Sequence, residues 1–128
     1  MRALLDTHAF LWWIADDARL SRTARDVIAS PDNEIIFSAA SAWEIAIKAR
    51  SGRLTLQVDA DAFISDQLAS NAFEVLPVML RHALRVYSLP DHHRDPFDRL
   101  LVAQAQIENV PMLTADTELA RYAIHTVW

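Results

Sequence analysis

Four acidic residues of this chain stand where a folded domain would bring their side chains together: Asp6, Glu44, Asp98 and Asp116. Asp6 ends the apolar run 1–5, and Asp116 ends the run 110–115. Glu44 lies in the helical stretch 41–48, and Asp98 lies near the start of another helix. Carboxylates held close together repel one another unless a cation neutralises them. Carboxylate oxygens suit a hard cation such as Mg²⁺ or Mn²⁺, so these residues favour metal-assisted hydrolysis of a phosphodiester.

Asp6 and Asp116 also have a structural interpretation. Each follows a predicted strand and precedes a helix, where Asp is a favoured N-cap residue. The two interpretations are compatible, because one oxygen can cap the helix while the other remains free for a metal. Thr114 stands two residues before Asp116, where its hydroxyl can bind a water of the metal.

Glu44, Asp95 and Asp98 have structural alternatives too. Glu44 precedes Lys48 by four residues, the favourable order for a surface ion pair on a helix. Its apolar neighbours instead indicate a buried carboxylate that needs Lys48 or a metal as its partner. Asp95 before Pro96 is a natural N-cap, and Asp98 then occupies the third helical position, which the helix dipole favours. Three residues apart on one helix, Asp95 and Asp98 also present oxygens on neighbouring faces, as a metal site needs.

Composition narrows the possible classes of protein. A length of 128 residues predicts a single domain, 1–128, large enough to bury roughly two-thirds of its unfolded surface. The absence of Cys excludes disulfide scaffolds and zinc–thiolate sites. The single glycine, Gly52, excludes glycine-rich phosphate loops. The net charge of −5 argues against a broad basic surface for nucleic acid, but it leaves room for a local site.

The sequence gives no indication of a membrane protein. No apolar run approaches the ~18 residues of a membrane span, and the charge of Asp6 comes too early for a signal peptide. Together with the absence of Cys, this predicts a cytoplasmic protein.

Short apolar runs alternate with helical patterns along the chain. We expect strands over 2–5, 34–37, 73–76 and 112–114, and an edge strand over 125–127. We expect helices over 6–14, 22–30, from Ser38 or Ser41 to 50, 60–70, 77–87, 96–109 and 117–122, with an extended linker near 54–58. This alternation indicates an α/β domain with a mainly parallel sheet. Ligands bind such sheets beyond the carboxyl ends of the strands, where Asp6 and Asp116 lie.

The remaining polar and aromatic residues carry less information. The four histidines considered are interpreted mainly as solvated side chains: His8, His92, His93 and His125. The tryptophans Trp12, Trp13 and Trp43 are interpreted as core or interface residues. Arg94 and Arg99 lie beside the acidic cluster in the sequence, where they can pair with its carboxylates, contact a phosphate or form structural ion pairs.

Together these segments resemble a PIN-domain ribonuclease of the VapC type, the toxin of a bacterial toxin–antitoxin pair. The resemblance covers nearly the whole chain and rests on four motifs in this order and at these separations. They are Leu4–His8, Ser41–Lys48, His93–Leu101 with Ala103 and Ala105 following, and Leu113–Asp116.

The resemblance implies a three-layer α/β/α domain with a central parallel sheet. It places the catalytic acids of the family on Asp6, Glu44, Asp98 and Asp116. Asp6, Asp98 and Asp116 would hold one or two Mg²⁺ ions, with Mn²⁺ as a substitute, and Glu44 would complete the shell or position the attacking water. Asp95, Thr114 and Arg99 would be auxiliary.

The resemblance also implies partners and products. The substrate would be RNA, such as tRNA or another structured RNA, and cleavage by water would leave a 5′-phosphate and a 3′-hydroxyl. The chain would form a homodimer and be silenced by a cognate VapB-type antitoxin, whose basic tail would suit the acidic surface.

The residues alone leave other functions open. The same acids would serve a metal-dependent phosphatase or DNA nuclease. A non-catalytic binding module would use them as caps and ion pairs. Phosphoryl transfer through an aspartyl nucleophile is disfavoured, because haloacid-dehalogenase-like enzymes have a second Asp two residues after the first, where this chain has His8.

Overall fold

A five-stranded parallel sheet forms the centre of the protein, which a computed structural model describes over residues 1–128. The strand order is β3-β2-β1-β4-β5, and every pair of neighbours is parallel. The strands are β1 (Arg2–Leu5), β2 (Glu34–Ser38), β3 (Glu74–Leu76), β4 (Met112–Leu113) and β5 (Thr126–Val127). The predicted central parallel sheet is therefore confirmed.

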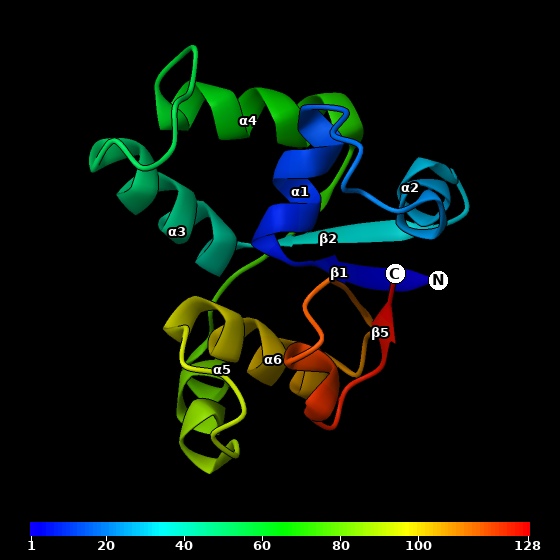
Figure 1. Ribbon diagram of the computed structural model, residues 1–128, viewed down its shortest axis with the longest axis vertical. Helices are drawn as coiled ribbons and strands as arrows, with labels where there is room; N and C mark the ends of the chain where they lie inside the picture. The colour runs from blue at the N-terminus through cyan, green and yellow to red at the C-terminus, as the bar shows by residue number, and fades with distance from the viewer.

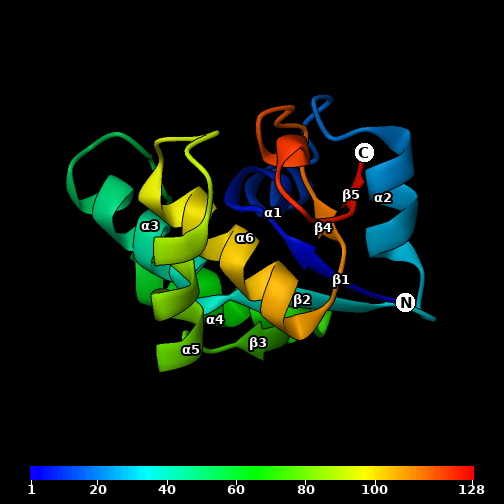
Figure 2. The same ribbon diagram turned by 90° about the horizontal axis from the view of Figure 1, so that it is seen from below.

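Six α-helices and two 3₁₀ turns complete the structure (Figure 1). They are α1 (Thr7–Ile14), α2 (Arg22–Ala29), α3 (Ala39–Arg50), α4 (Ala60–Asn71), α5 (Leu80–Arg85), η1 (Val86–Ser88), α6 (Pro96–Glu108) and η2 (Leu119–Arg121). Helices α1, α2 and α4 cover one face of the sheet, and α5 and α6 cover the other (Figures 1 and 2). This is the predicted three-layer α/β/α architecture. None of these helices is both long and apolar enough to cross a membrane.

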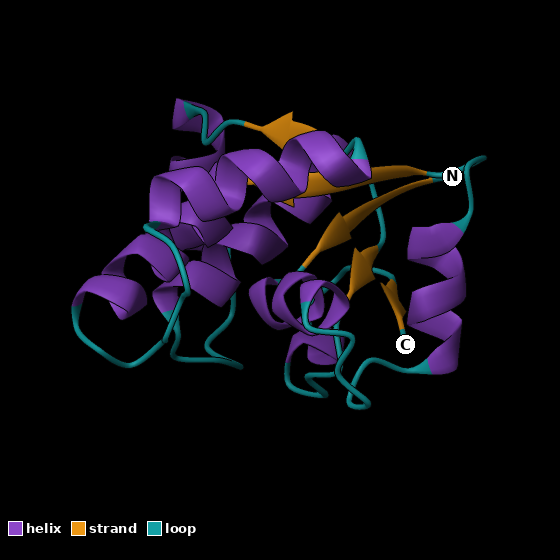
Figure 3. Cartoon of the chain, turned by 90° about the horizontal axis from the view of Figure 1, so that it is seen from above, coloured by secondary structure: helices purple, strands orange, loops and turns teal.

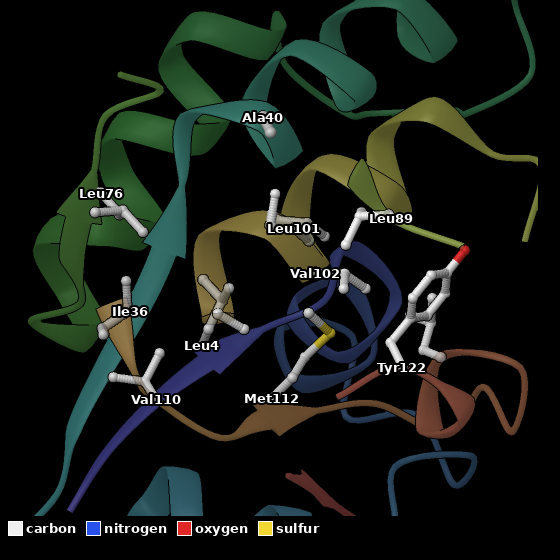
Figure 4. Close-up of a cluster of buried hydrophobic side chains, with 13 residues drawn as sticks. Leu4, Ile36, Ala40, Leu76, Leu89, Leu101, Val102, Val110, Met112 and Tyr122 are labelled. Carbon is white, nitrogen blue, oxygen red and sulfur yellow. The ribbon is translucent and has the colours of Figure 1, made fainter. Parts of the chain in front are cut away.

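The sheet has an apolar core on each face because successive residues of a strand point to opposite sides. In β1, Leu4 packs with α6 residues such as Leu101 and Val102 (Figure 4). Leu5 packs into the opposite core with Phe10 of α1. Burial on both faces explains why the strands are nearly continuous runs of apolar residues.

Polar side chains fix where the helices begin. Asp6, Ser21, Asp59 and Asp95 cap α1, α2, α4 and α6 by accepting main-chain N–H groups. Ser38 caps α3 through Ala40 N, which settles the choice between the two serines that the sequence left open. Asp6 directly follows β1 and Ser38 is the last residue of β2, so these two caps stand at the carboxyl end of the sheet, whose strands lie among the helices in Figure 3.

The helix predicted over 77–87 is shorter than expected. It begins at Leu80, because the His82 ring accepts the Met79 N–H while Gln104 donates to the Pro77 carbonyl. These contacts hold residues 77–79 extended.

The prediction of an α-helix over 117–122 is wrong. This segment forms only the 3₁₀ turn η2. Its first residues are held in a turn by Asp116, whose Oδ1 accepts the Glu118 N–H.

The strand order places two predicted site residues next to each other. The chain leaves β1 on one side towards β2 and β3, and later returns to the other side of β1 as β4 and β5. Leu5 of β1 is paired with Leu113 of β4, so these two strands end at the same level. Asp6 follows β1 and Thr114 follows β4, at the point where the strand order reverses. Open parallel sheets bind ligands at such a point.

Candidate metal centre

Asp6 is a buried carboxylate at the carboxyl end of β1. Its Oδ1 accepts the Ala9 N–H at 2.7 Å, so it caps α1. Burial raises the pKa of Asp6, whereas hydrogen bonds from Thr114 and from Ala9 act in the opposite direction. The predicted capping role is therefore confirmed, and it uses one of the two carboxylate oxygens.

Asp98 lies close to three other acidic residues. Burial, followed by the negative charges of Asp95, Asp6 and Glu44, raises the pKa of Asp98 to about 7, while His93 lowers it. Carboxylates influence one another in this way only when they lie close together. The chain thus brings Asp6 after β1, Glu44 of α3 and Asp98 of α6 close to one another.

Glu44 lies on the buried side of α3, and its side chain is only 4% exposed. Oε2 forms an ion pair with Lys48 one turn later, so the predicted i,i+4 pair exists. Oε1 is buried and has no hydrogen-bond partner. A buried, unpaired carboxylate oxygen is costly, and beside further acids it is an oxygen that a cation would satisfy.

Asp116 is held from two sides. Oδ1 accepts the Glu118 N–H at 2.9 Å, and Oδ2 lies 2.9 Å from His93 Nε2. The Asp116 N–H in turn donates to the Thr114 hydroxyl at 3.1 Å. Ligand atoms of His93, Asp98 and Asp116 all lie within 4.8 Å of one another, close enough for a single ion to contact.

The three auxiliary residues have distinct positions. Asp95 caps α6 by accepting the Asp98 N–H at 3.0 Å. Thr114 connects Asp6 with Asp116 through its hydroxyl. Arg99 is directed away from the four acids: it donates to the carbonyls of Val86, Leu89 and Pro90 and to the Tyr122 hydroxyl. Arg99 therefore acts by stabilising the loop before α6.

His93 belongs to this site although the sequence interpretation gave it little weight. Its ring lies between Asp116 and Asp98, 3.5 Å from the Oδ2 atom of Asp98. Its main-chain N–H donates to the hydroxyl of the buried Tyr122. The only signal in the sequence was its place in the motif 93–101, two residues before Asp95.

A cleft of about 740 Å³ lies beside α1, α3 and the segment 53–58, and none of the four acids lines it. Three basic residues line it, but Lys48 is paired with Glu44, and Arg19 is paired with Asp17, which lines the same cleft. Arg53 forms no ion pair, so its guanidinium can contact a phosphate of a polyanionic chain.

The donor set fits a hard divalent cation. It consists of carboxylate oxygens with no thiolate, it is partly buried, and it includes the unpaired Oε1 of Glu44. Asp6, Asp98 and Glu44 can supply oxygens directly, and Asp116 can do so directly or through water. Such a centre can activate water and neutralise charge on a phosphate.

Comparisons with known proteins find similarity over most of the chain. The PIN domain family model matches residues 3–125. Ribonuclease VapC22 of Mycobacterium tuberculosis is 32% identical over 117 residues, which cover 91% of this chain and 88% of that protein.

Solved structures share the fold at lower sequence identity. VapBC2 from Rickettsia felis bound to a DNA fragment from its promoter aligns with a TM-score of 0.74 and 13% identity, over 99% of this chain and 98% of that one. VapC20 of Mycobacterium tuberculosis, a sarcin-ricin loop cleaving toxin, aligns with a TM-score of 0.64 and 19% identity, over 94% and 96%.

Proposed function

Because this chain belongs to the PIN-domain family and resembles its VapC-type ribonuclease toxins, we propose that it is an Mg²⁺-dependent endoribonuclease controlled by a cognate antitoxin. The observation that carries the proposal is the convergence of Asp6, Glu44 and Asp98 with an unpaired buried oxygen on Glu44. A structural cluster of caps and ion pairs would pair that oxygen. A metal site leaves it for the ion.

Each acid has a role in the proposed reaction. Asp6, Asp98 and Asp116 hold Mg²⁺ directly or through water, and Mn²⁺ can take its place. Glu44 completes the shell or orients the attacking water. The ion supplies positive charge that activates the water and neutralises the phosphate and the leaving oxygen.

The chain's own residues prepare the remaining steps. The Ala9 N–H and the Thr114 hydroxyl fix the Asp6 carboxylate, and Lys48 holds Glu44 in place. Attack of water on phosphorus breaks the bond to the 3′ oxygen, which leaves with a proton. The products are a 5′-phosphate and a 3′-hydroxyl.

The proposed substrate is a structured RNA, such as tRNA. The names of two similar proteins support an RNA substrate: one is a ribonuclease, and the other is a toxin that cleaves the sarcin-ricin loop. Arg53, in the cleft beside α1 and α3, supports a contact with an RNA phosphate.

The proposed biological unit is a homodimer of single-domain chains in the cytoplasm, bound by a VapB-type antitoxin until the toxin is released. Support for the antitoxin comes from VapBC2, the toxin–antitoxin pair that shares this fold. The net charge of −5 favours a basic antitoxin segment.

Cleavage of total bacterial RNA by the purified protein tests the proposal. We expect fragments with 5′-phosphate ends in Mg²⁺ or Mn²⁺, none in EDTA, and at least about a 100-fold lower rate for Asp6→Asn, because metal charge stabilisation is worth several kcal/mol. Asn is an equally good N-cap, so this variant keeps α1.

Other outcomes identify the competing functions. Equal cleavage of single-stranded DNA would favour a general nuclease, and release of phosphate from a phosphomonoester without RNA cleavage would favour a phosphatase. No reaction with any of these substrates, by protein that also binds no metal, would favour a binding module.

A further inference from the structure

We propose that His93 is a positioning residue of this centre: as a hydrogen-bond donor it holds the Asp116 carboxylate beside Asp98. The proposal rests on the metal centre argued above and adds a positioning residue to it. Its basis is the geometry of the imidazole, which has a defined contact at each ring nitrogen.

The first step concerns which nitrogen carries the proton. His93 Nδ1 lies 3.0 Å from the main-chain nitrogen of Asp95, which is always a donor. Nδ1 is therefore the acceptor, and the neutral ring has its proton on Nε2. Nε2–H then donates to Asp116 Oδ2 at 2.9 Å and faces Asp98 Oδ2 at 3.5 Å.

This arrangement excludes His93 as a metal ligand through Nε2. Ligation would require the lone pair of Nε2, so the proton would have to move to Nδ1. Nδ1–H and the Asp95 N–H would then be two donors directed at each other over 3.0 Å, which leaves a poorly solvated N–H without an acceptor. The Asp95 N–H thus selects the donor form of His93.

The loop that carries His93 is rigidly organised. The His93 N–H donates to the Tyr122 hydroxyl at 3.0 Å, and Arg99 donates to the same hydroxyl at 3.0 Å. Figure 4 shows Tyr122 with its ring in the core and its hydroxyl directed out of it. Arg99, only 14% exposed, also binds the carbonyls of Pro90 and Leu89. One buried guanidinium therefore fixes the turn from which the imidazole projects.

The position of Nε2–H determines how the Asp116 carboxylate is oriented. Nε2–H contacts Oδ2 of Asp116 and faces Oδ2 of Asp98, and Oδ1 of Asp116 accepts the Glu118 N–H. Asp116 is therefore held at both oxygens beside Asp98, where it would contact a bound ion directly or through water.

Mn²⁺ binding measured by electron paramagnetic resonance tests the positioning role. His93→Leu should bind about 10- to 100-fold more weakly, as is typical when a hydrogen-bonding partner of a ligand is lost. His93→Gln should largely restore binding, since its amide N–H can replace Nε2–H. The exposed His125 provides a matched control, and His125→Gln should bind like the wild type.

Nitrogen-15 spectra of the histidine side chains test the proton position in the wild-type protein. We expect the Nε2–H form of His93 both without metal and with saturating Mg²⁺. Loss of the Nε2 proton on Mg²⁺ binding, or unchanged affinity in His93→Leu, would each overturn the proposal while leaving the ribonuclease function intact. No metal binding at all, with no RNA cleavage, would overturn the proposed function itself.

Discussion

The negative charge of Asp98 is opposed by its surroundings. Its carboxylate is partly buried at the start of α6 and faces the charges of Asp95, Asp6 and Glu44. The helix dipole favours its negative charge by only about 0.5 kcal/mol, which is too little to offset burial and three acids. The residue is therefore better suited to a bound cation than to an empty site.

The raised pKa of Asp98 predicts how stability depends on pH without metal. Between its ordinary pKa of 3.8 and its folded pKa of about 7, the folded protein binds more protons than the unfolded chain. The free energy of unfolding must therefore fall as pH rises through this range, by on the order of a few kcal/mol. Asp98→Asn removes this dependence, so in EDTA it should be more stable than the wild type at pH 7.5 and similar to it near pH 4.

Urea unfolding in EDTA at pH 4.5, 6 and 7.5 checks this prediction. The control is Asp66→Asn, because Asp66 is exposed on α4 and forms no ion pair. It should follow the wild-type curve. A wild-type protein that is as stable as Asp98→Asn at pH 7.5 in EDTA would contradict the electrostatic description of the site.

At the scale of single elements, α4 ends in an unfavourable conformation. Its C-cap Ala72 has φ 54° and ψ 38°, in the left-handed region. A non-glycine residue there costs roughly 1 kcal/mol. Ala72→Gly should therefore increase the free energy of unfolding by about 0.5–1 kcal/mol, after allowing for the larger entropy of glycine in the unfolded chain.

A glycine substitution within the same helix should have the opposite effect on the free energy of unfolding. Ala62→Gly, at an exposed position inside α4, should lower the free energy of unfolding by about 1 kcal/mol. Denaturant midpoints of both variants suffice for the comparison. Equal destabilisation by the two glycines would show that Ala72 is not strained.

The loop before α6 depends on Arg99. A lysine has one ammonium group and cannot serve the carbonyls of Val86, Leu89 and Pro90 and the Tyr122 hydroxyl at once. Arg99→Lys should destabilise the protein by about 1–3 kcal/mol and speed hydrogen exchange at the His93 amide. Arg94→Lys, in the same loop but at an exposed position, should leave exchange unchanged. Unaltered hydrogen exchange in Arg99→Lys would show that Arg99 does not hold the main chain of His93 in place.

The elements show which features could be predicted from the sequence. Asp6, Ser21 and Asp95 were recognisable as helix starts because capping depends on residues three positions apart. The start of α5 was not, since it depends on Gln104 binding the Pro77 carbonyl from 27 residues away. His93 was missed for the same reason: its partner Asp116 is 23 residues further along the chain.

At the scale of the whole molecule, the order of the strands determines where the site lies. The sequence predicted that Asp6 and Asp116 follow strands, and the parallel sheet followed from the alternation of strands and helices. That β1 and β4 are neighbours, with Leu5 opposite Leu113, depends on long-range pairing and became visible only in the structure. The reversal of strand order at β1 brings Asp6 beside Thr114 and gathers acids from opposite ends of the chain.

The measurement that tests the metal centre most directly is the effect of Mg²⁺ on unfolding at pH 7.5. Saturating Mg²⁺, at about 100 times its dissociation constant, should stabilise the wild type by about 2.7 kcal/mol relative to EDTA. Asp6→Asn keeps its cap, so it should be at least as stable as the wild type in EDTA but gain little from Mg²⁺. An equal gain in both proteins, or none in the wild type, would contradict a metal centre built on these carboxylates.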